Sequence, residues 1–225
     1  MAAIVTRWWW IRHAPVPGHA GRIHGQADHP ADCSDTATFA ALAALLPRDP
    51  VWVTSHLQRT QQTAQAIVAA MAGASGAAIE GRIEPALAEQ SFGAWQGQTF
   101  DELASQHQAA HDEFWQSPAS AVPPGGESFI EVVARVEAAV ERLTAAHPGR
   151  DIVAVGHGGS IRAALAVALG VKADRVLAFA IDPCSLTRLD HIRDPGRRDP
   201  DGHRPHGAAW RVVGVNLPAG TARRA

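Results

Sequence analysis

The sequence has few cysteines, no long apolar run and no block of like charge, and each shortage excludes a class of protein. Its two cysteines, Cys33 and Cys184, are far apart and lack the paired spacing of a metal site. Free thiols in a reducing compartment are therefore expected, which favours the cytoplasm. No apolar run approaches the roughly 18 residues that span a bilayer, and the first residues lack the apolar core of a signal peptide. A cytoplasmic protein without a membrane partner is expected.

The charge is nearly balanced. Lysine and arginine number 20 against 22 aspartates and glutamates, a net charge of -2. Without a basic stretch, no nucleic-acid partner is expected, although a few local cations can still hold a small anion. The length of 225 residues with 46% hydrophobic content suffices for one sizeable core. We therefore expect residues 1–225 to form a single domain.

The clearest pattern lies near the start of the chain, where the apolar run Trp8–Ile11 is followed by Arg12 and His13 and cut off by Pro15. Such a run predicts a short buried strand. Ligands bind at the carboxyl ends of strands in open α/β sheets, and an arginine beside a histidine there suits chemistry on an anion. The alternative is that the pair only caps a surface strand.

Two further strands are predicted to end in the same way. Val51–Thr54 is followed by Arg59, beside a helix expected over Thr60–Met71. Asp151–Val155 is followed by His157 in a glycine-rich turn before a helix over Ile161–Leu169. Cations and free N–H groups at a helix start both favour an anion. Small neighbours such as Gly158 let a ligand approach the backbone.

Two stretches between these strands are ambiguous. Leu87–Gly97 holds one carboxylate, Glu89, among glycines and aromatic residues. That setting favours the raised pKa of a general acid, but a packed turn with Glu89 facing water fits the composition equally well. The loop Pro15–Asp35 brings further polar side chains near the predicted site, or forms a plain surface loop. Those side chains are Arg22, His24 and Gln26.

Strands that alternate with helices predict an α/β fold, a three-layer α/β/α sandwich around a mostly parallel central sheet. A polar helix over Thr99–Trp115 belongs to an insertion at about 99–126 that covers one end of the sheet. A polar loop at about 191–209 is interpreted as a solvated hairpin rather than a metal site, because His203 and His206 lack companion cysteines. The remaining expected segments are helices Asp35–Leu46 and Ser128–His147, a linker Ala72–Ala78, strands Ile79–Ile83, Val176–Ile181, Ser185–Asp190 and Trp210–Val215, and a tail Leu217–Ala225.

Five motifs appear in a characteristic order. They are Arg12-His13-Ala14; Ser55, Arg59, Thr60, Thr63 and Ala64; Leu87, Glu89, Phe92, Gly93, Trp95 and Gly97; Pro124–Ser128; and Gly156–Gly159. Together they resemble the histidine phosphatase superfamily, in its phosphoglycerate-mutase-like branch. Ala14 stands where that family usually has glycine.

The resemblance implies a phosphoglycerate-mutase-like fold and a phosphatase that needs no metal or other cofactor. His13 would attack the phosphorus of a small phosphorylated metabolite and become a phosphohistidine. Arg12, Arg59 and His157, with the Gly158 turn, would surround the phosphoryl group. Glu89 would protonate the leaving alcohol and then activate water.

One departure concerns the first motif, which many members continue with a phosphate-contacting asparagine. Here Pro15–Gly18 follows instead, so Arg22, His24 or Gln26 is expected to compensate. The loop Gly21–Pro30 resembles that of α-ribazole phosphatase-like members, with His24 in place of tyrosine. The substrate suggested is α-ribazole 5′-phosphate of cobalamin assembly. A phosphoglycerate mutase and a catalytically silent phosphate-binding protein remain alternatives, and a homodimer is left open.

Overall fold

The computed structural model describes residues 2–18, 21–72, 81–194 and 208–220, and a six-stranded sheet lies at its centre. The strands are ordered β3-β2-β4-β1-β5-β6 across the sheet. The first four are mutually parallel, while β5 and β6 run antiparallel at one edge. Their bounds are β1 Ile4–Arg12, β2 Val51–Thr54, β3 Arg82–Ile83, β4 Asp151–Gly156, β5 Leu186–Arg193 and β6 Ala208–Leu217.

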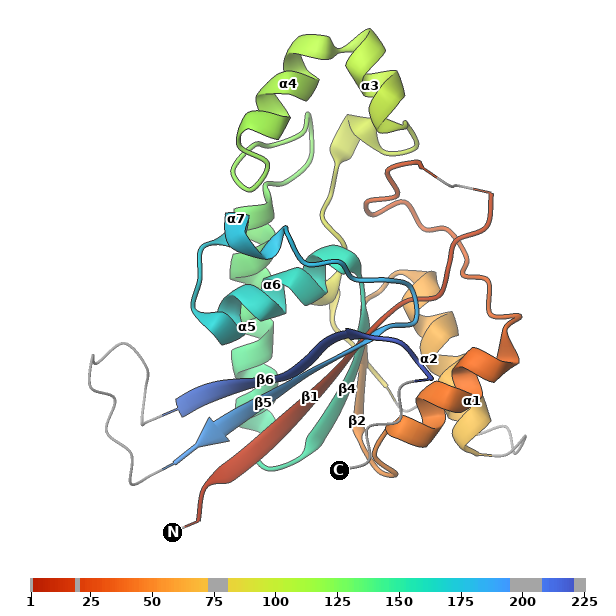
Figure 1. Cartoon of the computed structure of the whole chain (residues 1–225), viewed down its shortest axis with the longest axis vertical. Coiled ribbons are helices and arrows are strands. Elements are labelled where there is room, and N and C mark those ends of the chain that lie inside the picture. The colour runs from red at the N-terminus through yellow and green to blue at the C-terminus, as the bar shows by residue number, and fades with distance from the viewer. Residues whose placement is uncertain (1, 19–20, 73–80, 195–207, 221–225) are drawn as a thin grey trace.

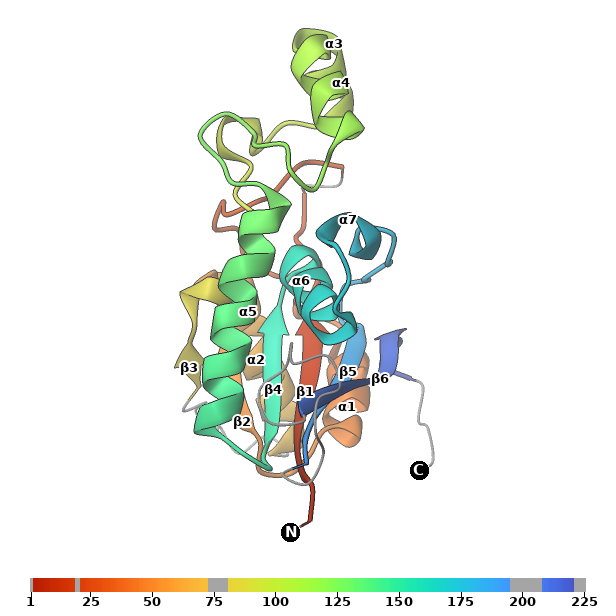
Figure 2. The same cartoon turned by 90° about the vertical axis from the view of Figure 1, so that its left-hand side faces the viewer.

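Helices cover both faces of this sheet, which confirms the predicted α/β sandwich (Figures 1 and 2). One face carries α1 and α2, the other α5 and α6, and α3 and α4 lie beyond the carboxyl ends of the parallel strands. The bounds are α1 Thr36–Leu45, α2 Gln58–Met71, α3 Phe100–Gln106, α4 Gln108–Gln116, α5 Phe129–Ala146, α6 Gly158–Leu169 and α7 Ala173–Val176.

The tryptophan-rich strand β1 is apolar without alternation because both of its faces meet helices. Trp8 and Trp10 are fully buried on the α5–α6 side, with stacked rings 5.2 Å apart. Trp9 and Ile11 face the α1–α2 side. The indole N–H of Trp8 donates to Thr144 Oγ1 at 3.0 Å, so even its polar atom is satisfied in the core. This packing fixes the strand that ends at Arg12.

Several helices begin where their capping residues predict. Asp35 accepts a hydrogen bond from the Thr38 N–H at the start of α1, and Ser128 forms a capping box with Glu131 at the start of α5. The apolar residues of α5 recur at helical spacing, and the stripe that they form is buried throughout. Its residues are Phe129, Val132, Val136, Val140 and Leu143.

The predicted strand Val176–Ile181 is wrong. Val176 ends the short helix α7, and no sheet pairing follows until Leu186. Val176 and Ile181 are buried in the cluster that includes α5 and α6, so their apolar character serves packing against helices rather than a sheet. Short apolar runs do not distinguish these two uses.

Other bounds differ from expectation by less. The helix expected over Thr99–Trp115 is two helices that meet at His107, and α6 begins at Gly158 rather than Ile161. Of the strand expected over Ile79–Ile83, the described part pairs only at Arg82–Ile83. The linker 73–78, most of the polar loop 191–209 and the tail 221–225 lie outside the described residues.

Candidate active site

The carboxyl ends of β1 and β4 bring the two predicted histidines together. Arg12 lies opposite Gly156 in the parallel pairing, and the next residues along the chain are His13 and His157. The His13 N–H donates to the Gly156 carbonyl at 3.0 Å, and the two imidazole centroids lie 5.1 Å apart. The neighbouring strand β2 leads into α2, which supplies Arg59. Three predicted strand ends therefore meet at one edge of the sheet.

His13 is held as a neutral imidazole with a defined tautomer. Its Nδ1 lies 2.7 Å from the Ala14 carbonyl, which can only accept, so Nδ1 carries the proton and Nε2 keeps a lone pair. Burial, together with the charges of Arg59 and Arg12, lowers the pKa of His13 from 6.5 to about 3, and the hydrogen bond to Ala14 opposes this shift. The residue as a whole is 6% exposed. Its Nε2 is suited to nucleophilic attack at neutral pH.

His157 is fully buried at the start of α6, and burial lowers its pKa well below the usual value. Its Nε2 lies 2.8 Å from Ser55 Oγ. The assignment in which this hydroxyl donates to Nε2 leaves the ring proton on Nδ1. That atom is buried and has no hydrogen-bond partner among the described residues. His157 then presents a neutral N–H donor.

Two guanidinium groups, one fully buried and one partly buried, complete the positive surroundings. Arg59 is fully buried, and its Nη1 and Nη2 donate to the carbonyls of Ala27 and Gly25 at 2.8 and 2.7 Å. Burial lowers the pKa of Arg59, against the charges of Glu89 and Asp28. The Nη1 of Arg12 donates to the Ile181 carbonyl. The Nε of each arginine is buried without a partner in the described part of the chain, as is His157 Nδ1. Buried donors without partners are costly, and a bound anion would accept their hydrogen bonds.

Glu89 docks on the first turn of α6. Its Oε1 accepts hydrogen bonds from the Gly159 and Gln90 N–H groups at 3.0 and 2.9 Å. A Cβ on Gly159 would lie 2.1 Å from that oxygen, so glycine is what lets the carboxylate approach the helix start. The carboxylate that the sequence left ambiguous therefore faces the site, where it can transfer a proton.

Arg135 and Glu127, which the sequence reading did not single out as site residues, hold the Glu89 loop in place. Arg135 donates to the carbonyls of Ala86, Ala88 and Glu89 over 2.6–3.0 Å and forms a two-pronged ion pair with Glu127. Glu127 also accepts from the Ser91 N–H at 2.9 Å. The turn motif Pro124–Ser128 could have identified Glu127, but no sequence motif marks an arginine within a helix such as Arg135.

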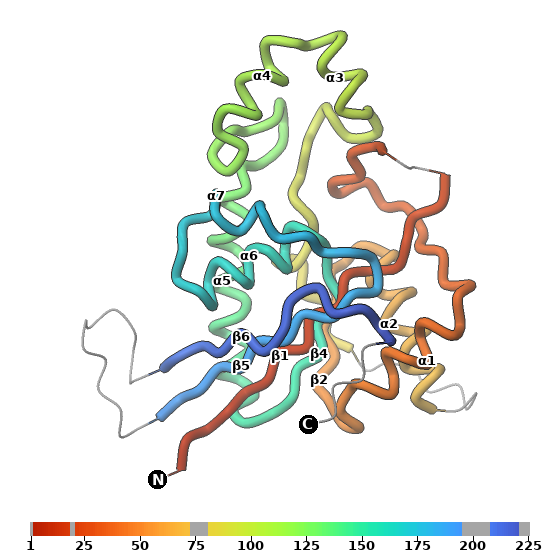
Figure 3. The backbone as a smooth tube through the Cα atoms, in the orientation of Figure 1, coloured from red at the N-terminus to blue at the C-terminus, as the bar shows by residue number. Residues whose placement is uncertain are grey.

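The three candidates for the missing asparagine separate in the structure. Gln26 donates from Nε2 to the Glu89 carbonyl at 3.0 Å, so it supports the loop that carries Glu89. His24 lies near enough for its charge to lower the pKa of His13. Arg22 instead donates to Gly97 and pairs with Glu102 at 3.1 Å, and its side chain is 41% exposed. Figure 3 shows the loop that carries these three residues beside the segment that leads into α3. The two segments pair through an isolated antiparallel bridge between Arg22 and Thr99.

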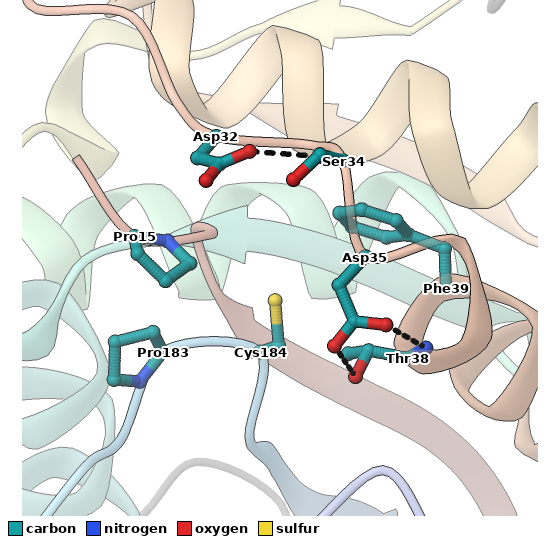
Figure 4. A pocket seen from close by; sticks show the side chains of 8 residues that line it. All are labelled: Pro15, Asp32, Ser34, Asp35, Thr38, Phe39, Pro183 and Cys184. Atoms are coloured by element: carbon teal, nitrogen blue, oxygen red, sulfur yellow. Dashed lines mark hydrogen bonds between the residues drawn. The ribbon is translucent and has the colours of Figure 1, made fainter. Parts of the chain in front are cut away.

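A separate cavity of about 190 Å³ lies around Cys184, between Pro15, Phe39 and Pro183 (Figure 4). Its carboxylates are already engaged, since Asp32 accepts from Ser34 and Asp35 caps α1. Both cysteines are free thiols, as predicted. Burial raises the pKa of Cys184 to about 11, so its thiol stays protonated and unreactive.

Among the described residues, no cluster of three or more histidine, cysteine, aspartate or glutamate side chains is arranged to hold a metal ion. No helix in the described ranges is long and apolar enough to cross a bilayer.

The chain is similar to known proteins over most of its length. The profile of the histidine phosphatase superfamily (branch 1) matches residues 8–198. Glucosyl-3-phosphoglycerate phosphatase of Mycolicibacterium vanbaalenii is 35% identical over 182 residues, which cover 76% of this chain and 77% of that protein. The bifunctional protein Rv2228c of Mycobacterium tuberculosis is 32% identical over 142 residues, 63% of this chain, and the match spans only 37% of that longer protein.

The fold is also that of solved structures. The α-ribazole phosphatase of Shigella flexneri superposes with a TM-score of 0.74 at 24% identity, covering 97% of this chain and all of the other. At that identity the likeness describes the fold.

Proposed function

Because the chain belongs to the histidine phosphatase superfamily, we propose that it hydrolyses a small phosphomonoester through a phosphohistidine on His13, without a metal ion. The observation that carries the proposal is a neutral His13 Nε2 beside three buried N–H donors that lack protein partners among the described residues. A tetrahedral dianion beside Nε2 would satisfy those donors. The free thiols Cys33 and Cys184 support a reducing compartment such as the cytoplasm.

In the first step, the lone pair on His13 Nε2 attacks phosphorus and the bond to the ester oxygen breaks. Glu89 gives its proton to that oxygen, so the alcohol leaves neutral. The Nδ1 proton stays on the ring and remains hydrogen-bonded to the Ala14 carbonyl, which disperses the positive charge of the phosphorylated ring. Arg12, Arg59 and His157 stabilise the charge on the three equatorial oxygens.

In the second step, water attacks phosphorus from the side that the alcohol has left. The Glu89 carboxylate accepts a proton from this water, the N–P bond breaks, and inorganic phosphate leaves. His13 returns to the neutral tautomer and Glu89 to its protonated form. Each proton that Glu89 donates is thus recovered within one turnover.

Two substrates have specific support. The loop Gly21–Pro30 resembles that of α-ribazole phosphatase-like members and suggests α-ribazole 5′-phosphate. The relative that is 35% identical is named for glucosyl-3-phosphoglycerate. Both are phosphomonoesters of a small sugar-like alcohol, which fits a site with a single set of phosphate-binding groups.

The test is phosphate release with EDTA present, from p-nitrophenyl phosphate and from both candidate substrates. We expect wild type to turn over and His13→Ala to lose about a thousandfold or more. The control His147→Ala changes a residue at the C-terminal end of α5, just before the start of β4 and away from the strand ends that form the site, and should match wild type. Equal rates in wild type and His13→Ala, or phosphate transfer only to an acceptor from a bisphosphate primer, would overturn the proposed hydrolysis.

A further inference from the structure

Arg162 adds a positive charge to the site that the mechanism above does not use. It lies four residues after Gly158 on α6, so both face the same side of the helix. Its Nε donates to the Phe179 carbonyl at 2.8 Å, which fixes one edge of the guanidinium. Its Nη1 lies 3.3 Å from the point where a Cβ on Gly158 would be.

Glu89 and Arg12 approach the same point beside Gly158 that Arg162 approaches. Glu89 Oε2 lies 3.9 Å from it and Arg12 Nε lies 4.0 Å from it. Arg162 therefore borders the space between the general acid and the phosphate-binding arginine. Because Glu89 protonates the ester oxygen, this is the side of the site where the alcohol part of the substrate must lie.

The Arg162 charge is not neutralised by the protein. It belongs to none of the ion pairs recorded for the described residues, and neither Nη group hydrogen-bonds to them. Arg135, by contrast, is paired with Glu127 and with three carbonyls. Burial lowers the pKa of Arg162, opposed by the charge of Glu89, so the group is partly desolvated beside an acid that it does not contact as an ion pair.

We propose that Arg162 binds a carboxylate carried on the alcohol part of the substrate, which makes the substrate a phosphorylated hydroxy acid. This inference rests on the proposed phosphatase function. Arg12 and Arg59 balance the two charges of a phosphoryl dianion, and the Nη edge of Arg162 remains for one more. A planar carboxylate matches that edge with two parallel N–H···O bonds and a single charge.

The proposal distinguishes the two candidate substrates. The alcohol part of α-ribazole 5′-phosphate carries no carboxylate, whereas a phosphoglycerate does. Arg162 therefore favours substrates of the phosphoglycerate type.

The test compares 3-phosphoglycerate with glycerol 3-phosphate, which differ only by a carboxylate in place of a hydroxymethyl group. We expect wild type to favour 3-phosphoglycerate in kcat/KM by about tenfold or more, the usual worth of one charged hydrogen-bonded pair. Arg162→Met should remove the preference, and Arg162→Lys should keep part of it. The control Arg150→Met changes an arginine that pairs with Asp49 at the far end of β4, and should keep the full preference.

Calorimetric binding of the same two compounds to His13→Ala separates the failure of this inference from that of the proposed function. An Arg162-dependent preference in binding without any turnover by wild type would contradict the phosphatase but support the carboxylate site. Turnover without a preference would overturn the carboxylate site alone. So would an equal loss on both compounds in Arg162→Met, since Arg162 would then act on the phosphoryl group.

Discussion

The imidazole of His13 is almost completely buried, and its chemistry follows from the cost of charging it there. A buried histidine without a negative partner stays neutral, so its nucleophilic nitrogen is available at pH values where an exposed histidine is largely protonated. His157 obeys the same rule, and there the neutral ring serves as a donor. Both rings carry their proton on Nδ1, but the Ala14 carbonyl engages that N–H in His13 and leaves Nε2 free, whereas the Ser55 hydroxyl engages Nε2 in His157 and leaves the N–H free of partners among the described residues.

This burial predicts how stability depends on pH. The folded pKa of His13 is about 3 and the unfolded value is 6.5, so the unfolded chain binds more protons between these values. This difference in proton binding stabilises the folded state fully above pH 6.5, and the stabilisation is lost as the pH falls toward 3. Between pH 7 and pH 5, protonation of His13 in the unfolded chain should lower the free energy of unfolding by about 2 kcal/mol. Urea denaturation of wild type and His13→Gln measures it. Identical pH slopes in the two proteins would contradict the assignment.

The acid loop, residues 86–91, depends on α5 rather than on its own structure. Arg135 occupies three of its carbonyls, and Glu127 binds the Ser91 N–H from the turn that begins α5. Loops without regular hydrogen bonding keep their geometry only when such groups hold them. Arg135 is therefore a positioning residue that acts through Glu89.

We predict that Arg135→Met slows hydrolysis of alkyl phosphates about tenfold to a hundredfold in kcat. Hydrolysis of p-nitrophenyl phosphate should change much less, since its leaving group departs without a proton. Steady-state rates over a series of leaving groups measure the difference. Arg175→Met, on a side chain that is 77% exposed, serves as control. A uniform loss across all leaving groups would mean that Arg135 is needed for the fold and not for Glu89.

The sequence predicted elements where one physical signal dominates. The helix expected over Ser128–His147, with apolar residues at helical spacing, and the buried run in β1 each have such a signal, and both are confirmed. Val176–Ile181 was misassigned because a run packed against helices looks the same as a buried strand. The break between α3 and α4 at His107 has no proline or glycine to announce it.

At the site, sequence motifs identified the groups expected to touch phosphate but not those behind them. Arg12, Arg59 and His157 could be placed together because parallel strands end at one edge. Arg135 and Arg162 are helix arginines, which a sequence cannot tell from solvated ones. Only the packing of α5 on the acid loop, and of α6 against the segment at Phe179, shows that they point inward.

On the scale of the whole molecule, the site depends on a sheet whose two faces are packed by separate hydrophobic clusters. The central strand β1 contributes to both, so a cavity there should weaken the entire fold. We predict that Trp8→Ala lowers the free energy of unfolding by about 3–5 kcal/mol, because it leaves a large cavity and an unpaired Thr144 hydroxyl. Trp115→Ala, at a 50% exposed position on α4, should cost less than about 1 kcal/mol. Urea denaturation compares both, and similar losses would contradict a core centred on β1.

The central claim is that His13 carries the phosphoryl group between the two steps. Rapid acid-free quenching of wild type with excess p-nitrophenyl phosphate, followed by intact-mass and peptide analysis, tests it most directly. We predict one phosphate per chain, stable to alkali and labile to acid, on the peptide that contains His13, and accumulating further in Glu89→Gln. Turnover with no phosphorylated chain in either protein, or a phosphate on a different residue, would contradict the account.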